Sequence, residues 1–189
     1  MGQLYIPVLL GGVSNQPEAR FVAELIAAVG AGLDGIETEV ISSESFDFPG
    51  DGNDPEGKDA RYTAITARAD GFFVVAAERN HGFPGSLKRM LDSELKHYIH
   101  KPVAFAGLSN DQWGGVRGIE ALVSTVREMG LVVTFSDMQF PHAAELFDAT
   151  GVLQNDSYRR YIEGAWTELI WMATVLRQGR ETVPSKYHT

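Results

Sequence analysis

Three glycine-bearing loops hold the residues of this chain whose types and spacing could do chemistry. They span residues 11–16, 76–86 and 107–118, and each follows an apolar run and precedes a run with helical spacing. In an open α/β sheet, ligands bind outside the carboxyl ends of the strands, where such loops lie. Gly82 and Gly85 would shape the second loop and let a ligand approach its backbone. The pattern predicts a small-molecule site, and the alternative is a set of ordinary strand-to-helix connections.

The first loop is a candidate phosphate site. It reads G-G-V-S-N-Q over residues 11–16 and is followed by Pro17 and Glu18, two residue types that favour the first turn of a helix. Free backbone N–H groups and the helix dipole favour a phosphate at such a position. The loop contains the Ser14 hydroxyl but neither Lys nor Arg.

The second and third loops resemble segments of a known family. Residues 80–88 read N-H-G-F-P-G-S-L-K and are similar to the P-E-Y-N-x-(S/G)-x-P-G-x-L-K-N segment of the NADPH-dependent FMN reductase family. Residues 107–118 resemble that family's S-x-G-G-x-G-G-x-R loop. The residues of this loop that match are Ser109, Gly114, Gly115 and Arg117. The resemblance covers most of the chain, from Leu4 to about Leu176.

The β–α alternation and this resemblance together imply an α/β protein with a flavodoxin-like fold. We expect a three-layer α/β/α sandwich around a five-stranded parallel sheet with the strand order 2-1-3-4-5. The expected strands are residues 4–10, 36–41, 70–75, 102–106 and 131–135. Residues 1–189 would form a single domain, with a last helix from about Tyr158 to Arg177 and a flexible tail over residues 178–189.

The resemblance implies an FMN-dependent NAD(P)H oxidoreductase that reduces flavin, quinone or a similar small acceptor. FMN would be the cofactor, and NADPH or NADH would be the electron donor. Because the flavin carries the redox chemistry, no side chain is assigned as catalytic. The candidate cofactor-binding residues are Gly12, Val13, Ser14, Asn15, Gln16, Glu78, Arg79, Asn80, His81, Gly82, Ser109, Gly114, Gly115 and Arg117.

The resemblance also divides these residues by role. Residues 12–16 would hold the phosphate, and residues 78–82 would line the ring through main-chain groups. The Arg79 guanidinium would stack on the flavin or supply the cation that the first loop lacks. A solvated surface arginine is equally compatible with the sequence. Arg117 would meet the 2′-phosphate of NADPH or pair with Glu120 on its own helix.

Three departures from the family's pattern support a rival from a different class. The first loop lacks the family's cation, Arg79 replaces a tyrosine, and residues 110–112 (N-D-Q) replace small residues. The rival is a non-catalytic flavodoxin-like relative that binds flavin weakly or not at all. It would act as a binding or regulatory protein.

Three further motifs are not favoured by their context. Residues 30–35 match G-x-G-x-x-G, but they follow a helix and precede a strand, so they predict a helix stop and a turn. Residues 51–54 resemble a calcium loop, but Pro55 occupies the third ligand position. A hydrolase motif at residues 107–109 (G-L-S) lacks a closing glycine and leaves His142 as the only candidate triad histidine.

The composition excludes several classes of protein. The chain has 189 residues, a net charge of −9 and no cysteine, which excludes disulfides and thiolate metal sites. The charge disfavours nucleic acid and anionic membrane as partners, and no apolar run is long enough to span a bilayer. We expect no metal site, a cytoplasmic location, and a homodimer or homotetramer. Trp171, Met172 and Val175 lie off the core stripe of the last helix, where they could form an interface or belong to a wide buried face.

Overall fold

The computed structural model describes residues 2–12, 16–50 and 55–188. Its α-helices are α1 (Pro17–Ala31), α2 (Ala60–Arg68), α3 (Gly85–Asp92), α4 (Val116–Glu128), α5 (Ala143–Leu146) and α6 (Ser157–Thr182). Short 3₁₀ helices span Ser43–Ser45 and Pro55–Gly57. Its strands are β1 (Leu4–Tyr5), β2 (Val8–Leu10), β3 (Ile36–Glu37), β4 (Val40–Ser42), β5 (Phe72–Ala77), β6 (Pro102–Leu108), β7 (Val132–Val133) and β8 (Met138–Phe140).

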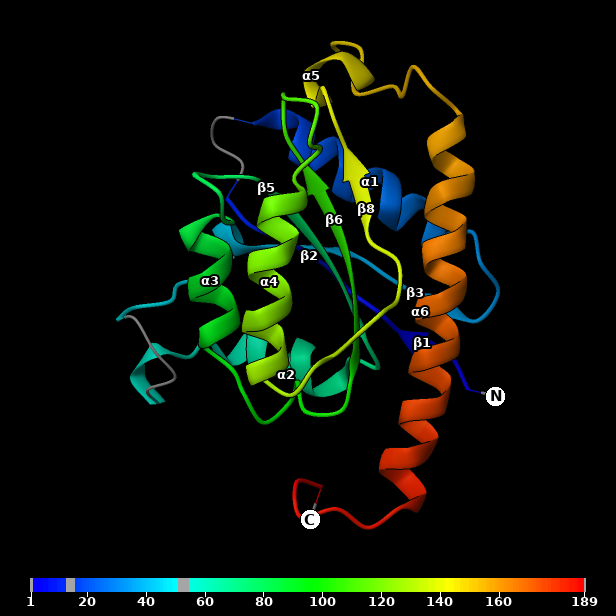
Figure 1. Cartoon of the computed structure of the whole chain (residues 1–189). Coiled ribbons are helices and arrows are strands. Elements are labelled where there is room, and N and C mark those ends of the chain that lie inside the picture. The colour runs from blue at the N-terminus through cyan, green and yellow to red at the C-terminus, as the bar shows by residue number, and fades with distance from the viewer. Residues whose placement is uncertain (1, 13–15, 51–54, 189) are drawn as a thin grey trace.

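The strands form a parallel sheet between two layers of helices (Figure 1). Five strands lie in the order β4-β2-β5-β6-β7, and β8 also pairs with β6, which gives a six-stranded sheet. The strands β1 and β3 form a separate two-stranded parallel sheet. Helices α1 and α6 pack on one face of the main sheet, and α2, α3 and α4 pack on the other. The expected three-layer α/β/α sandwich is therefore present.

The central strands are apolar along their whole length because helices cover both of their faces. In β5, Phe73 and Val75 belong to the core under α1 and α6, whereas Phe72 and Val74 belong to the core under α2, α3 and α4. Trp166 fixes α6 to the sheet and to α1. Its ring lies 5.5 Å from the ring of Phe73, and its Nε1–H donates to the Ile26 carbonyl at 3.0 Å.

The expected five-stranded sheet with the order 2-1-3-4-5 is wrong in strand number and in order. The expected first strand is two strands, β1 and β2, separated by Ile6 and Pro7. Proline has no N–H to donate to a strand ladder, which explains the break. The expected second strand is likewise divided into β3 and β4.

The expected fifth strand, residues 131–135, is shortened to β7, and β8 follows it as a further strand beside β6. Val133 pairs with Val103, and Met138 pairs with Ala106, so five steps along this segment oppose only three along β6. The extra residues leave the sheet as an excursion that carries Phe135, which is 94% exposed. A run of apolar residues does not reveal where such an excursion begins.

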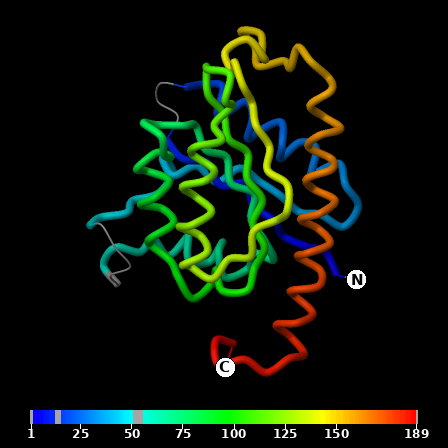
Figure 2. The backbone as a smooth tube through the Cα atoms, in the orientation of Figure 1, coloured from blue at the N-terminus to red at the C-terminus, as the bar shows by residue number. Residues whose placement is uncertain are grey.

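Helix α6 is longer than expected and continues beyond the sheet (Figures 1 and 2). It runs to Thr182, five residues past the expected end at Arg177, so residues 178–182 are helix rather than tail. The chain then turns back toward the body. There the Nε2 of His188 lies 2.9 Å from the Nδ1 of His100. Helix α1 ends at Ala31, which confirms the helix stop predicted for residues 30–35.

Candidate functional site

The three predicted loops meet at the carboxyl edge of the sheet. Strands β2, β5 and β6 are parallel neighbours, so their carboxyl ends lie on the same edge. The Gly12 N–H donates to the Ser86 hydroxyl at 2.7 Å, which joins the first loop to the second. The Glu78 N–H donates to the Leu108 carbonyl at 2.9 Å, which joins the second loop to the start of the third.

The glycines of the first loop allow helix α3 to approach closely. A Cβ on Gly11 would lie 2.6 Å from the Leu87 Cβ, and one on Gly12 would lie 2.7 Å from the Ser86 Oγ. Gln16 is the N-cap residue of α1, and its Oε1 is buried without a hydrogen-bond partner among the described residues. Three predicted phosphate-loop residues lie outside the described residues, namely Val13, Ser14 and Asn15.

A cation lies near the first loop, although the loop itself contains none. The Nη2 of Arg20 in α1 lies 3.7 Å from the Oε2 of Glu44. The Oε1 of Glu44 lies 3.9 Å from the position that a Cβ on Gly12 would take. Our sequence analysis missed Arg20, although it follows Gln16 by four residues, a helical spacing that places side chains on one face. It also missed Ser86, which lies within the N-H-G-F-P-G-S-L-K segment.

The second loop is a hairpin with two residues at its turn. Arg79 and Gly82 exchange both of their backbone hydrogen bonds, at 2.9 and 2.8 Å. Between them, Asn80 and His81 have φ angles of 48° and 63°. Two successive left-handed residues fit a type I′ turn, so the turn rests on Asn80 and His81 rather than on Gly82 and Gly85. Left-handed residues other than glycine are uncommon, and such strain clusters at functional sites.

Arg117 joins the second and third loops through three contacts. Its Nη2 lies 2.5 Å from Glu78 Oε1 and 2.7 Å from Asp111 Oδ2. Its Nη1 lies 3.1 Å from His81 Nε2. Because arginine can only donate, the Nε2 of His81 accepts this bond and carries no proton. The expected pairing of Arg117 with Glu120 is wrong, since its carboxylate partners are Glu78 and Asp111.

Hydrogen bonds within the third loop favour the ionised form of the Asp111 side chain. The Ser109 hydroxyl donates to Asp111 Oδ1 at 2.6 Å, and this bond is the largest cause that lowers the pKa of Asp111. The Trp113 N–H donates to the same oxygen at 2.8 Å and lowers that pKa further. The hydrogen bond to Glu78 raises the pKa of Arg117. Asp111 and Arg117 are therefore a stable ion pair at neutral pH.

Two buried polar atoms in this network have no partner. The Glu78 side chain is 7% exposed, and its Oε2 accepts no hydrogen bond from any described residue. The Nε of Arg117 is also buried and, within the described ranges, has no acceptor. One acceptor and one donor are thus available at the junction of the second and third loops.

The close packing of the third loop requires glycine at positions 114 and 115. Gly114 has a φ of 58°, and a Cβ there would lie 2.8 Å from the Pro141 nitrogen. Gly115 has a φ of 85°, and a Cβ there would overlap the Leu108 nitrogen. Gly115 is also the N-cap residue of α4, so its conformation sets where that helix begins and where Arg117 is placed.

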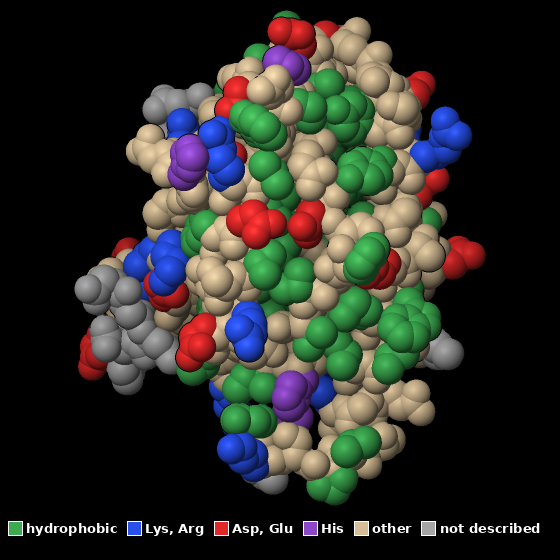
Figure 3. All heavy atoms as spheres, viewed as in Figure 1, with side chains coloured by type: hydrophobic (Ala, Val, Ile, Leu, Met, Phe, Trp, Pro, Cys, Tyr) green, Lys and Arg blue, Asp and Glu red, His purple; other side chains and the backbone are tan. Residues whose placement is uncertain are grey.

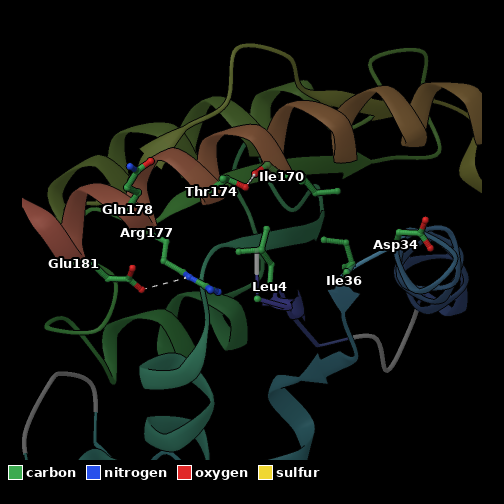
Figure 4. A pocket seen from close by; sticks show the side chains of 10 residues that line it. Leu4, Asp34, Ile36, Ile170, Thr174, Arg177, Gln178 and Glu181 are labelled. Carbon is green, nitrogen blue, oxygen red and sulfur yellow. Dashed lines mark hydrogen bonds and ion pairs between the residues drawn. The ribbon is translucent and has the colours of Figure 1, made fainter.

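A pocket of about 520 Å³ lies at the opposite edge of the sheet (Figure 4). It is bordered by α6 and by the starts of β1 and β3, with Leu4 and Ile36 facing Ile170. Arg177 and Glu181 of α6 form an ion pair at its rim. Among the predicted cofactor-binding residues that the structure describes, none borders this pocket. It is a separate feature of the molecule.

Comparisons with known proteins give a family and a fold. The family model described as NADPH-dependent FMN reductase matches residues 5–145. The structure is similar to FerB, a flavoenzyme NAD(P)H:(acceptor) oxidoreductase from Paracoccus denitrificans, with a TM-score of 0.73 and 14% identity over 93% of this chain and 98% of that chain. It is also similar to an oxidoreductase from Corynebacterium diphtheriae, with a TM-score of 0.72 and 18% identity over 93% of this chain and 99% of that chain.

A third similar structure is a flavodoxin from the domain Archaea. Its TM-score is 0.62 and its identity 14%, over 91% of this chain and 99% of that chain. At such identities a structural likeness shows the fold alone, and the fold is flavodoxin-like. No curated protein sequence matches this chain.

Proposed function

Because this chain belongs to the NADPH-dependent FMN reductase family, we propose that it is an FMN-dependent NAD(P)H oxidoreductase that reduces flavins, quinones or similar small acceptors. The observation that carries this proposal is the meeting of the three loops at the carboxyl edge of the sheet. Ligands of open α/β sheets bind at that edge.

The first loop and the start of α1 would hold the FMN phosphate. The first turn of a helix has free N–H groups and the positive end of the helix dipole, both of which favour an anion. Pro17 at the start of α1 has no N–H to satisfy. Arg20, one turn further along, adds a positive charge near the loop. The Ser86 hydroxyl adds a side-chain donor from α3.

The second and third loops would hold the isoalloxazine ring. Leaving buried polar atoms unpaired is costly. The Oε2 of Glu78 is such an acceptor and the Nε–H of Arg117 is such a donor. The pyrimidine edge of the ring has both an N–H group and carbonyl groups, so it can pair with both atoms. These two orphaned atoms support a flavin at this junction.

FMN, when bound, passes electrons from a reduced nicotinamide to the acceptor. The residues of the chain bind and orient it. Arg117 ties the hairpin at residues 79–82 to the third loop, so that the two walls keep a fixed separation. In the neutral ring of His81 the proton lies on Nδ1, because Nε2 accepts from Arg117, and His81 therefore presents a donor. We propose that Arg79, which is exposed at the same turn, stacks on the flavin.

The alternative function, a non-catalytic relative that binds flavin weakly or not at all, is not favoured. The contacts around the residues that differ from the family's pattern argue against it. We propose that Arg20, whose Nη2 lies 3.7 Å from Glu44, supplies the cation that the first loop lacks. Asp111, the acid within residues 110–112, is bound by Ser109 and Arg117. Its charge is therefore balanced inside the third loop and does not act alone on a ligand.

We also propose that the protein forms a homodimer or homotetramer through the outer face of α6. Trp171 and Val175 on this helix are 67% and 45% exposed. Figure 3 shows hydrophobic side chains gathered over α6, on the right of the view. Exposed aromatic residues are enriched at protein interfaces. In the described part of the chain, no helix is long and apolar enough to cross a membrane.

Steady-state oxidation of NADH and NADPH tests the proposed activity. The purified protein is saturated with FMN, and oxidation of each donor is followed with and without a quinone. We expect oxidation that requires both FMN and the quinone. The variant Arg117→Gln should slow it, whereas Arg127→Gln, an exposed substitution on the same helix, should not. An FMN-loaded protein that oxidises neither donor would contradict the activity.

A further inference from the structure

The amino-terminal edge of the sheet, opposite the three loops, carries a second group of pockets. Two pockets of about 420 and 360 Å³ share Lys101 and Arg180 as lining residues. At the bottom of Figure 3 the surface is hollowed between the C-terminal segment and the body, with histidine and basic side chains at the edge of the hollow. We propose that this basin, defined by Lys101, Arg177, Arg180 and Lys96, binds the phosphoryl group of a small molecule.

Lys101 is the central cation of the basin. It is only 6% exposed, and its Nζ donates to the carbonyls of Thr66 and Ala67 at 2.7 and 3.2 Å. An ammonium group has three N–H donors, and these two acceptors are uncharged. Within the described residues, no carboxylate lies within 4.0 Å of this nitrogen. Lys101 is thus a buried positive charge without a direct counter-charge.

Two arginines beside Lys101 share a single buried carboxylate. The Asp70 side chain is 13% exposed, and its Oδ2 lies 3.2 Å from the Nη1 of Arg177. Its Oδ1 lies 3.6 Å from the Nη2 of Arg180. The Oδ2 also accepts a hydrogen bond from the Tyr5 N–H at 3.1 Å. The Asp70 carboxylate therefore has three partners.

The charges in the basin therefore do not balance. Lys101, Arg177 and Arg180 face one buried acid, Asp70, and one acid at the rim, Glu181, whose side chain is 65% exposed. A third acid on the wall, Glu37, is paired with Arg68, so that pair does not change the balance. This excess of positive charge lies in a chain with a net charge of −9. Buried charges are costly unless they are paired, so an anion that entered the basin would be stabilised.

The lowered pKa of Lys101 is consistent with a basin that lacks an anion beside this lysine. Burial, and next the nearby Arg180, lower the pKa of Lys101 to about 8. A bound anion would act in the opposite direction and raise that pKa. The titration of this single group therefore reports on occupancy.

The other walls of the basin supply further donors. Lys96 and His97 border it from the segment after α3, and Tyr187 and His188 border it from the C-terminal segment. A phosphoryl group has several acceptor oxygens, and Arg and Lys are the side chains that proteins use to bind it. A carboxylate has only two oxygens and a single charge. The number of donors and the surplus of charge together favour the phosphoryl group.

The test is a titration of the ¹⁵N-labelled full-length protein with inorganic phosphate at constant ionic strength. We expect saturable shifts in the amides of Ala67, Lys101 and Arg180, both with and without FMN. The variants Arg180→Gln and Lys96→Gln should each weaken binding about tenfold. Lys96 is exposed, so its variant should fold even if loss of Arg180 disturbs the contacts of Asp70. Arg160→Gln, which removes an exposed charge at the start of α6, at the opposite end of that helix from Arg180, should have no effect.

Several results would overturn the inference. They are shifts confined to residues near the first loop, shifts no larger than those caused by chloride, and acetate binding as tight as phosphate binding. Equal weakening by Arg160→Gln would also overturn it. Because the basin lies at the opposite edge from the proposed flavin site, the outcome does not depend on FMN. A protein that binds FMN but not phosphate here refutes only this inference.

Discussion

At the residue scale, Arg117 explains more of the candidate site than any single sequence motif does. From the sequence, one expected role of Arg117 was to bind the 2′-phosphate of NADPH. In the structure its guanidinium contacts Glu78, Asp111 and His81. Its side chain is 32% exposed, whereas that of Glu78 is 7% exposed. The contact therefore has two roles, since it compensates a buried carboxylate and fixes the distance between two loops.

Replacing Arg117 with methionine should leave the Glu78 carboxylate buried without its cation. We expect the free energy of unfolding to fall, measured by urea denaturation. Adding Glu78→Gln should recover part of this loss, because the unpaired charge is then removed. Arg127→Met on the same helix serves as the control. An Arg117→Met protein as stable as the parent would contradict the role assigned to the pair.

Lys101 makes stability depend on pH in a predictable direction. Its pKa in the folded protein is about 8, against an ordinary value of 10.5. Between these values the unfolded chain holds a proton that the folded protein has lost, so stability rises with pH. We expect this rise from about pH 8 to about pH 10.5 in phosphate-free buffer, and urea denaturation at each pH measures it. Lys101→Met should flatten the curve, and a flat curve for the parent protein would show that the lysine is not perturbed.

At the element scale, the apolar runs of the sequence predicted the layers well and the strands less well. Strands β5 and β6 were predictable because both of their faces are buried, which produces an unbroken apolar run. The break at Pro7 was missed although proline is a local signal for it, whereas the break around Phe135 depends on the register with β6 and leaves no such signal. The predicted number and order of the strands were therefore wrong, although the predicted layers were correct.

The candidate site was predictable to a similar degree. The three loops were found because glycine and polar residues interrupt the apolar runs, and the structure joins them at one edge. The contacts between loops were not found, since Gly12 and Ser86 are 74 residues apart and Arg117 and His81 are 36 residues apart. Pairing over such separations is decided by the fold and leaves no local signal.

The start of α4 should be sensitive to any side chain at Gly115. Gly115→Ala would place a Cβ against Leu108 at a φ of 85°, so we expect a loss of about 3 kcal/mol in the free energy of unfolding. Gly164→Ala in α6 is the matched control, because nothing lies within 4 Å of the added Cβ. That change should raise stability by about 0.5–1 kcal/mol. Equal effects of the two substitutions, measured by urea denaturation, would contradict the close packing of the third loop.

At the scale of the whole molecule, the two edges of the sheet differ in chemistry. The carboxyl edge carries loops with balanced ion pairs and orphaned polar atoms, where we propose a flavin. The amino edge carries a surplus of buried cations, where we propose a phosphoryl group. Since the sheet separates them, the two sites can be tested independently.

The outer face of α6 should determine the oligomeric state. Trp171→Ser removes the large exposed ring from this face, and we expect it to lower the molar mass measured by light scattering during size-exclusion chromatography. Phe135→Ser is the control, because Phe135 is 94% exposed and lies outside α6. A parent protein that elutes as a monomer would refute the proposed interface, and so would an equal effect of the two substitutions.

The most direct test of the central proposal is the titration of FMN with the purified protein, followed by quenching of flavin fluorescence. Contacts from three loops to the phosphate and the ring should give saturable binding at about micromolar concentration. The variant Arg117→Gln should weaken that binding, and Arg127→Gln should leave it unchanged. Absence of binding at about millimolar FMN would contradict the proposal and would favour the non-catalytic relative instead.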